Sequence, residues 1–308
     1  MSIIPGSIDR LRSEIERFGF IDGVRYWKRQ ASVRTRADVT GVNVYERDWD
    51  ALILLDACRV DELERQSRRF EFLSEMNKIP SVATYSPSWM ANTFGDATQT
   101  ELDNTAYITA NPFSKEISEV EEVGYVDHVW QYATDPSLNV VPPRPVTDRA
   151  IETARSKSLD RLIIHYMQPH APFIRQSDGE LETILQGVQS ENDYGEGLGV
   201  WPAIYAGHVD SDEVVEAYRE TLALVLQDVE LLLKNLNAPE TVISADHGQL
   251  FGEKGLFGHP SNMPLPAVQY VPWVKTRSVD SNDYNPDKYD HDIDSVGRKE
   301  HLRALGYQ

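Results

Sequence analysis

Three short apolar runs in this chain each end at ionisable residues. The run in DALILLDACR ends at Asp56, the run in DRLIIHYMQPHAPF leads to His165 and His170, and the run in ETVISADHG leads to Asp246 and His247. Continuous apolar runs of this length are typical of strands that are buried on both faces of a sheet. Residues 211–236, SDEVVEAYRETLALVLQDVELLLKNL, instead have helical spacing, with Ser211 as the expected N-cap.

Strands that alternate with helices predict an α/β fold. We expect a three-layer sandwich, in which a mostly parallel central sheet is covered by helices on both faces. Ligands of such sheets bind at the carboxyl ends of the strands. Because all three apolar runs place their ionisable residues at that end, the sequence predicts a functional site there.

Composition divides the chain into three parts. We expect an N-terminal helical extension over residues 1–45, an α/β domain over 46–277 and an acidic C-terminal tail over 278–308. Basic and aromatic residues at 25–29 fit docking to a membrane or a partner, but a helix packed on its own domain is the favoured interpretation. Residues 174–210 are rich in Gly, Asp and Glu, which predicts a long excursion over the sheet of the kind that forms a lid.

Charge narrows the choice of partners and compartment. The 308 residues include 49 acidic and 30 basic side chains, and the formal net charge of −19 repels nucleic acid and anionic headgroups. Such a surface fits a solvated face, including that of a protein from a high-salt cytoplasm. Cys58 is the only cysteine, so no intrachain disulfide forms, and no apolar run reaches transmembrane length. We therefore expect a cytoplasmic, halophilic protein with no nucleic-acid partner and no transmembrane segment.

Aspartate and histidine together favour a divalent metal site. Carboxylate and imidazole ligands suit zinc or manganese, whereas carboxylates alone suit magnesium or calcium. Asp246 and His247 are adjacent, and Gly248 gives the chain the freedom to turn both toward one ion. The evidence for a metal site is stronger because four further residues are expected at the same edge of the sheet: Asp56, His165, His170 and His259.

Five segments resemble, in consistent order, motifs of the alkaline phosphatase and sulfatase superfamily. VISADHGQLFGEKGLFGH is similar to the C-terminal metal motif, ILLDACRVD to the first strand, and HYMQPHAPF to the segment whose second histidine contacts the transferred group. YRETLALVLQDVELLLKNL and LPAVQYVPWVKT resemble the helix before the metal motif and the strand after it. The match covers about residues 50–277 and implies an alkaline phosphatase-like fold.

The resemblance also implies roles for individual residues. Asp56, Asp246 and His247 are expected to bind a divalent ion (zinc, manganese, magnesium or calcium), with one or two ions in all. His259 is expected to bind the second ion or touch substrate, and a satisfied loop histidine is the alternative. His170 and His165 are expected to contact the transferred group or to hold a second ion.

The segment TYSPSWMANTFG is similar to the sulfatase nucleophile segment Cys-x-Pro-x-Arg. Anchored on Pro87, the cysteine position falls on Tyr85 and the arginine position on Trp89, so formylglycine cannot form. Cys58 lacks the proline and arginine companions and is not expected to replace it. The hydroxyls nearby are Thr84, Ser86 and Ser88; Ser86 is the favoured nucleophile and Thr84 the next. The alternative is that Ser86 and Ser88 cap a helix that starts near Trp89.

The leading hypothesis is a metal-dependent hydrolase or transferase of phosphate esters that uses a serine or threonine nucleophile. A sulfatase-type ester hydrolase and a non-catalytic binding protein on a sulfatase-like scaffold are the alternatives. Arg59 is expected to clamp a phosphate or to pair with Asp61. The substrate is expected to be a small-molecule, glycan-linked or lipid-linked ester, and the sequence identifies neither the natural substrate nor the oligomeric state.

Overall fold

The computed structural model describes residues 40–185 and 199–289, together with isolated residues between 11 and 28. The expected N-terminal extension, with its basic and aromatic cluster, lies almost wholly outside the described residues. Residues 186–198 and the tail beyond Tyr289 also lie outside them. The division of the chain at residues 45 and 277 stays a prediction.

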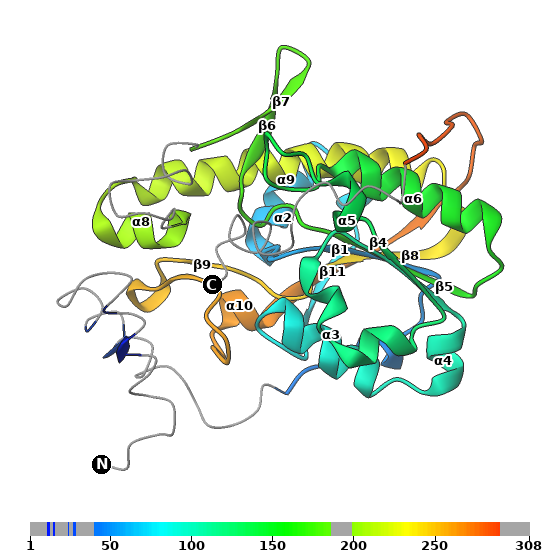
Figure 1. Cartoon of the computed structure of the whole chain (residues 1–308), viewed down its shortest axis with the longest axis horizontal. Helices are drawn as coiled ribbons and strands as arrows, with labels where there is room; N and C mark the ends of the chain where they lie inside the picture. The colour runs from blue at the N-terminus through cyan, green and yellow to red at the C-terminus, as the bar shows by residue number, and fades with distance from the viewer. Residues whose placement is uncertain are drawn as a thin grey trace.

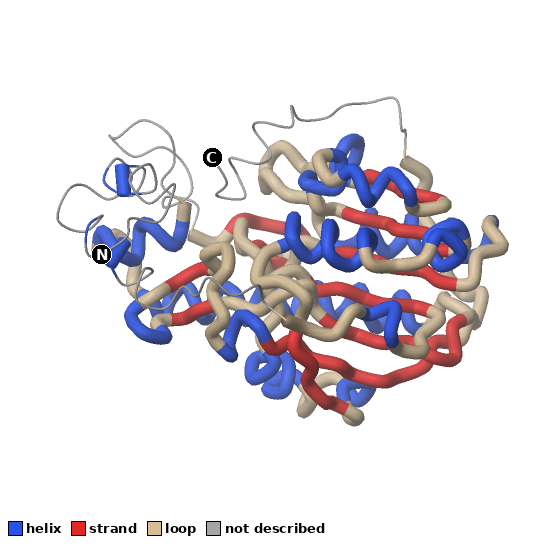
Figure 2. Tube along the Cα trace, turned by 90° about the horizontal axis from the view of Figure 1, so that it is seen from below, coloured by secondary structure: helices blue, strands red, loops and turns tan. Residues whose placement is uncertain are grey.

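A seven-stranded sheet in the order β2-β11-β8-β1-β5-β3-β4 forms the centre of the described chain. Its strands are β1 (Ala51–Leu55), β2 (Met76–Pro80), β3 (Thr105–Thr109), β4 (Tyr125–His128), β5 (Arg161–Tyr166), β8 (Ala238–Ser244) and β11 (Tyr270–Ser278). The pairs among β8, β1, β5, β3 and β4 are parallel, whereas β11 runs antiparallel to both of its neighbours, β8 and β2. Figure 2 shows these strands side by side in one layer.

Helices cover both faces of this sheet (Figure 1). Helices α6 (Pro143–Ser156) and α9 (Ser211–Leu233) lie side by side on one face, and α3 (Ser86–Gly95) and α4 (Gln99–Asp103) lie on the other. The predicted class, an α/β three-layer sandwich with a mostly parallel central sheet, is confirmed. None of the helices in the two described ranges combines the length and the apolar character needed to cross a bilayer.

Short elements fill the connections. The short helices are α2 (Val60–Gln66), α5 (Trp130–Ala133), α8 (Val200–Ala206), α10 (Pro266–Gln269) and the 3-10 turns η1 (Val44–Glu46), η2 (Glu71–Leu73), η3 (Pro112–Lys115), η4 (Ser118–Glu122) and η5 (Glu253–Gly255). The short strands are β6 (Ile174–Ser177) with β7 (Glu180–Thr183), and β9 (Leu250–Phe251) with β10 (Phe257–Gly258).

The apolar runs of the sequence are the most buried strands. All five residues of β1 are fully buried, and Ile53 pairs with Ile164 of β5 and with Ile243 of β8. Removing apolar surface from water on both faces stabilises the fold by about 25 cal/mol per Å². The central strand β1 is therefore held from both sides and fixes where Asp56 leaves the sheet.

Helix α9 has a different N-cap from the predicted Ser211. The cap is Asp210, whose backbone is extended (φ −75°, ψ 140°) and whose carboxylate accepts a hydrogen bond from the Asp212 N–H at 2.7 Å. Both residue types cap helices well. The prediction was wrong by one residue because Asp210, and not Ser211, adopts the extended backbone that a cap requires.

The excursion over residues 174–210 contains ordered elements in its described parts. Strands β6 and β7 form a hairpin that projects from the sheet (Figure 1). Helix α8 packs on the β9–β10 hairpin, where the Tyr205 hydroxyl accepts from Phe257 N at 2.7 Å and the Trp201 ring stacks on Phe251. A lid role for this segment stays a prediction.

Candidate metal and catalytic site

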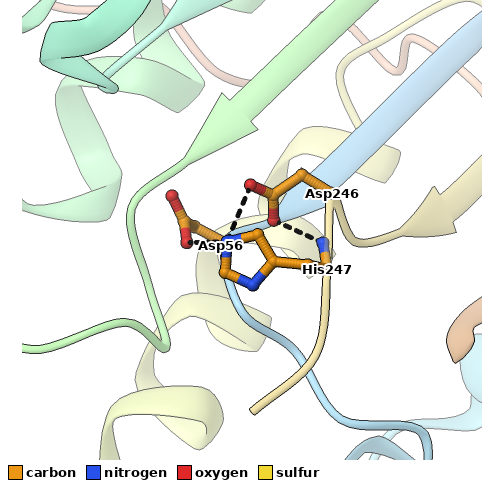
Figure 3. A group of neighbouring side chains, drawn as sticks. All are labelled: Asp56, Asp246 and His247. Atoms are coloured by element: carbon orange, nitrogen blue, oxygen red, sulfur yellow. Dashed lines mark hydrogen bonds and ion pairs between the residues drawn. The ribbon is translucent and has the colours of Figure 1, made fainter. Parts of the chain in front are cut away.

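The site residues come together because three neighbouring strands end at the same edge of the sheet. Asp56 follows β1, Asp246 and His247 follow β8, and His165 lies in β5. As expected, the ligand atoms of Asp56, Asp246 and His247 lie within 4.8 Å of one another, and all three side chains are fully buried. Figure 3 shows the two carboxylates and the imidazole pointing toward one another.

Each carboxylate of this group has one oxygen paired and one unpaired. Asp56 Oδ2 accepts from Ser86 Oγ at 3.2 Å and from Asn111 Nδ2 at 3.0 Å. Asp246 Oδ1 accepts from the backbone N–H groups of Ala57 at 3.2 Å and His247 at 2.9 Å. The other two oxygens, Asp56 Oδ1 and Asp246 Oδ2, are buried without a hydrogen-bond partner. Buried polar atoms in native proteins are rarely left in that state without a functional reason.

The imidazole of His247 is oriented by the backbone. Its Nδ1 lies 2.9 Å from the carbonyl oxygen of Gly248, and because a carbonyl only accepts, Nδ1 carries the proton. Nε2 then carries a lone pair, and it lies 3.3 Å from Asp246 Oδ2 and 3.7 Å from Asp56 Oδ1. This fixed tautomer is the one that a metal-binding histidine uses.

Gly248 is required for a different reason from the one expected. A Cβ at this position would lie 2.1 Å from the Ala267 carbonyl oxygen, and the Gly248 N–H donates to the Val268 carbonyl at 2.7 Å. Gly248 is also absent from the glycines with positive φ. Its role is therefore to let two backbone segments approach closely, and not to provide an unusual turn conformation.

The residues fit a divalent ion. Two unpaired carboxylate oxygens and one imidazole nitrogen, all buried, form a donor set suited to zinc or manganese. Metal–ligand distances are about 2 Å, so two ligands of one ion lie at most about 4 Å apart, and atoms that already lie within 4.8 Å of one another need only small shifts to share an ion. The metal-ligand roles of Asp56, Asp246 and His247 stay predictions that this geometry supports.

The two carboxylates need a cation to remain charged together. Burial, and next the Asp246 carboxylate, raise the pKa of Asp56 well above its usual range. Burial also acts to raise the pKa of Asp246, but the His247 and His165 imidazoles outweigh it and hold that pKa below its usual value. A divalent cation beside both groups would favour the charged form of each and so compete with protons for them.

Ser86 is the hydroxyl that lies against this group. It is fully buried, and its Oγ lies 3.2 Å from Asp56 Oδ2 and 3.4 Å from His247 Nε2. Helix α3 starts at Ser86 itself, and its N-cap, Tyr85, has no side-chain capping bond. The alternative that Ser86 and Ser88 cap a helix starting near Trp89 is therefore wrong, because the helix begins three residues earlier and the Ser86 hydroxyl turns to the carboxylate.

The other expected nucleophile lies further from the ligands. Thr84 is buried in the turn before α3, and its Oγ1 accepts from the backbone N–H of Met263 at 3.3 Å. Ser88 is half-buried in the first turn of α3. Among the three hydroxyls, only Ser86 has a hydrogen bond to one of the candidate metal ligands in the described structure.

His170 and His259 extend the group. Their Nε2 atoms lie 2.8 Å apart, and the His259 ring lies 4.4 Å from the ring of His247, measured between centroids. His170 Nδ1 donates to the Ala171 carbonyl at 2.5 Å, so its Nε2 carries a lone pair. Burial lowers the pKa of His170 to about 4 and that of His259 well below its usual value, so both rings are neutral at pH 7. His259 is only half-buried, and this side of the site lies closest to solvent.

His165 lies beside the carboxylate pair. Its Nε2 is 3.8 Å from Asp56 Oδ2 and 3.8 Å from Asp246 Oδ2 and has no hydrogen-bond partner. Its Nδ1 lies 2.8 Å from the Tyr107 hydroxyl. Burial lowers the pKa of His165 to about 4, so a neutral ring faces the two carboxylates. Its expected contact with substrate stays a prediction.

The sequence leaves two roles open for Arg59, a phosphate clamp or an ion pair with Asp61, and the structure shows the ion pair. Its guanidinium donates to both Asp61 oxygens at 2.9 and 2.8 Å, to Glu253 at 2.6 Å and to the Gln249 carbonyl at 2.8 Å. These bonds tie the turn after β1 to the β9–β10 hairpin. They occupy donors that a phosphate clamp would also need, and the substrate-binding role expected for Arg59 stays a prediction.

Sequence reasoning missed Asn111. This buried residue follows β3, and its amide donates to Asp56 Oδ2 while its carbonyl oxygen accepts from Phe113 N at 3.0 Å. The signal was present, since TAYITAN is a fourth run that ends in a polar residue. Because Thr105 and Thr109 lower the apolar character of that run, the run was not recognised as a buried strand.

Comparison with known proteins gives the class to which this fold belongs. No family model matches the sequence, and no curated protein matches it. The integral membrane protein lipooligosaccharide phosphoethanolamine transferase A of Neisseria meningitidis is 14% identical, with 93% of this chain and 58% of that chain covered and a TM-score of 0.50. The soluble domain of the same transferase is 14% identical, with 72% and 75% covered and a TM-score of 0.47.

A protein in the alkaline phosphatase superfamily from Vibrio parahaemolyticus is 10% identical, with 96% of this chain and 78% of that chain covered and a TM-score of 0.39. The likeness at these identities is one of fold. The solved structures similar in fold to this chain include phosphoethanolamine transferases and a protein of the alkaline phosphatase superfamily, in line with the predicted resemblance, whereas the halophilic character of the protein stays a prediction. The chain spans 58% of the length of the integral membrane transferase.

Proposed function

We propose that this protein is a divalent-metal-dependent hydrolase or transferase of phosphate esters, with Ser86 as its nucleophile. The observation that carries the proposal is the place of the Ser86 hydroxyl. It lies at the first residue of α3, within hydrogen-bond distance of Asp56 Oδ2 and next to His247 Nε2. A hydroxyl directed at a carboxylate, beside unpaired metal-type ligands, is the arrangement of an activated nucleophile.

Asp56, Asp246 and His247 would hold the ion. A bound divalent ion supplies Lewis-acid stabilisation for a serine alkoxide and for phosphoryl oxygens. The chain itself contributes orientation: Asn111 holds Asp56 Oδ2, and Asp56 Oδ2 accepts from Ser86. The N-terminal end of α3 adds a partial positive charge beside the negative charge that gathers on the phosphoryl group.

The proposed reaction has two steps. In the first, Ser86 Oγ forms a bond to phosphorus while the bond to the leaving alcohol breaks, and the Ser86 proton passes toward Asp56 Oδ2. The leaving oxygen takes up a proton from the solvent side, where His170 and His259 lie. In the second step, the oxygen of water or of an acceptor alcohol forms a bond to phosphorus and gives up its proton to the solvent side. The bond between phosphorus and Ser86 Oγ breaks, and Ser86 Oγ takes back the proton from Asp56 Oδ2.

The pair of His170 and His259 supports contact with the transferred group. Both rings are neutral, and their Nε2 atoms point toward each other beside His247. Neutral imidazoles either donate hydrogen bonds to phosphoryl oxygens or bind a second ion. We propose that they act at the solvent side of Ser86 in one of these ways.

The choice between hydrolase and transferase depends on which acceptor resolves the phosphoserine. One structure with a similar fold is described as a lipooligosaccharide phosphoethanolamine transferase. This supports, as part of the proposal, an ester substrate that is small or is linked to a lipid or glycan. A cytoplasmic location and the absence of a nucleic-acid partner stay predictions from the sequence.

A sulfate ester is the second candidate substrate, because sulfate and phosphate are both tetrahedral oxyanions for which the same groups provide contacts. Formylglycine chemistry is not available to this chain. Tyr85 and Trp89 stand where that chemistry needs cysteine and arginine, and burial raises the pKa of the Cys58 thiol well above its usual range. A non-catalytic binding protein with the same ligands is the third candidate.

The test combines metal analysis with turnover. Purified protein is stripped with chelator, reloaded with zinc, manganese, magnesium or calcium, and assayed on nitrophenyl phosphate, bis-nitrophenyl phosphate and nitrophenyl sulfate. Ser86→Ala is expected to abolish turnover and keep metal content, whereas Ser88→Ala, in the same helical turn, and Cys58→Ala are expected to keep most activity. Removing a nucleophile costs several orders of magnitude in rate. A protein that binds no ion and hydrolyses none of these esters would rule out the enzyme.

A further inference from the structure

The turn that follows Asp56 has an unusual backbone. Ala57 has φ +60°, the left-handed region, which costs a non-glycine residue roughly 1 kcal/mol. Its N–H donates to Asp246 Oδ1 at 3.2 Å, and the next N–H, of Cys58, closes the turn on Leu55 O at 3.1 Å. One candidate ligand is therefore held by a backbone group of a strained turn.

A side chain from a distant helix fixes this turn on its other side. Tyr218, in α9, donates from its hydroxyl to the Ala57 carbonyl at 2.9 Å and accepts from the Arg59 N–H at 3.0 Å. The ring is fully buried, and it packs edge-on against Phe251 with centroids 4.9 Å apart. Both backbone groups that Tyr218 engages belong to the turn, so the hydroxyl holds the left-handed conformation in place.

We propose that Tyr218 is a positioning residue of the candidate metal site, acting through the Ala57 turn on Asp246. With Ala57 N–H on Oδ1, the carboxylate is rotated so that Oδ2 lies 3.3 Å from His247 Nε2 and stays unpaired. Without the hydroxyl, the turn relaxes toward negative φ, and the Ala57 N–H leaves Oδ1. The carboxylate then rotates more freely, and metal affinity falls. The inference rests on the proposed metal site.

Tyr45 supplies the matched control. It is also a buried tyrosine whose hydroxyl donates to a polar partner, Thr105 Oγ1, at 3.1 Å. Thr105 is the first residue of β3 and therefore lies at the amino-terminal end of the parallel strands, whereas the site lies at their carboxyl ends. Tyr45→Phe and Tyr218→Phe therefore each delete a hydroxyl from a buried ring, and only the second deletion touches the Ala57 turn.

The experiment measures metal affinity and not turnover. Chelator-stripped full-length proteins are titrated with zinc and with manganese in competition with a fluorescent chelator, and their metal-free thermal unfolding is recorded. Tyr218→Phe is expected to weaken binding about 10- to 100-fold, as loss of groups that orient metal ligands does. Tyr45→Phe is expected to bind like the unmodified protein, even if its melting temperature falls as much.

Ala57→Gly makes the test independent of folding defects. Glycine adopts positive φ without strain, so Ala57→Gly is expected to restore part of the affinity that Tyr218→Phe loses. If Tyr218→Phe does not fold alone, the comparison is made in the Ala57→Gly background, where the loss should be smaller than 10-fold. Unchanged affinity in Tyr218→Phe, or equal losses in both phenylalanine variants, would overturn the positioning role. No metal binding by the unmodified protein would instead overturn the metal site itself.

Discussion

Asp246→Asn is expected to have opposite effects on two properties of the protein: it should stabilise the metal-free fold and abolish metal binding. The ligand atoms of the two carboxylates lie no more than 4.8 Å apart, and at an effective dielectric constant of about 20 two unit charges at that distance repel by about 3.5 kcal/mol. Burial and the Asp246 carboxylate raise the pKa of Asp56 well above its usual range, so protonation of Asp56 relieves this repulsion as the pH falls. The introduced amide oxygen still accepts from the backbone N–H groups of Ala57 and His247, and the amide carries no charge to repel Asp56, so the metal-free variant should gain about 1 to 3 kcal/mol of stability.

The same substitution is expected to remove the response to metal. An ion that binds only the folded state stabilises it by about 2.7 kcal/mol at a hundred times its Kd, which corresponds to a rise of roughly 5 °C or more in melting temperature for a domain of this size. Differential scanning calorimetry of the unmodified protein with and without zinc or manganese should show this shift, and Asp246→Asn should not.

Asp228→Asn is the control, because Asp228 is a buried carboxylate whose partner is Arg144, at 2.6 Å. It should destabilise the protein and preserve the metal response. Two results would contradict these expectations: metal-free Asp246→Asn melts below the unmodified protein, or its melting temperature still rises when metal is added. The first result would mean that the two carboxylates do not repel in the folded chain, and the second that Asp246 is not a ligand.

Three further outcomes are expected. The melting temperature should rise from low to molar potassium chloride, because salt screens the repulsion of a net charge of −19; an unchanged value would remove the halophile hypothesis. Burial lowers the pKa of His128 to about 4 from about 6.5 unfolded, so its stabilising contribution is complete above pH 6.5 and is lost as the pH falls toward 4. His128→Gln should therefore lose less stability between pH 7 and 5 in urea titrations, and an equal loss would contradict this. Gly248→Ala should lower the free energy of unfolding by several kcal/mol, because its Cβ meets the Ala267 carbonyl at 2.1 Å, whereas Gly95→Ala, with only Glu119 Cγ at 3.5 Å, should be nearly neutral.

The strands that carry the ligands were predictable because burial on both faces leaves a continuous apolar signal. Asp56, Asp246 and His247 follow from that signal, since parallel neighbours end at one edge. Asn111 did not follow, because the strand before it carries threonines whose hydroxyls are satisfied only in the folded chain, as when Thr105 Oγ1 donates to Glu101 O at 2.7 Å.

Features that depend on distant partners were not predictable from local patterns. The acceptor Glu253 of Arg59 lies 194 residues along the chain, and the carbonyl that makes Gly248 necessary comes from Ala267. The start of α3 was placed too late because the sequence does not reveal that Tyr85 is extended, with φ −163°. Each of these depends on which backbone segments meet, and that is decided by the whole sheet.

The position of β1 between β5 and β8 has a consequence for the order in which the protein matures. The backbone bond from Ala57 to Asp246 closes a loop of 189 residues, and the Asp50 carboxylate accepts from Glu240 N across 190. Contacts of such high sequence separation form late, because the entropy of closing the loop is paid before they gain energy. During synthesis, β1, which ends next to Asp56, therefore pairs with β8 only after β8, the last parallel strand along the chain, has left the ribosome. Binding of a metal at the proposed site is therefore expected only after the chain has folded completely, and a retained ion would then report a correctly folded chain.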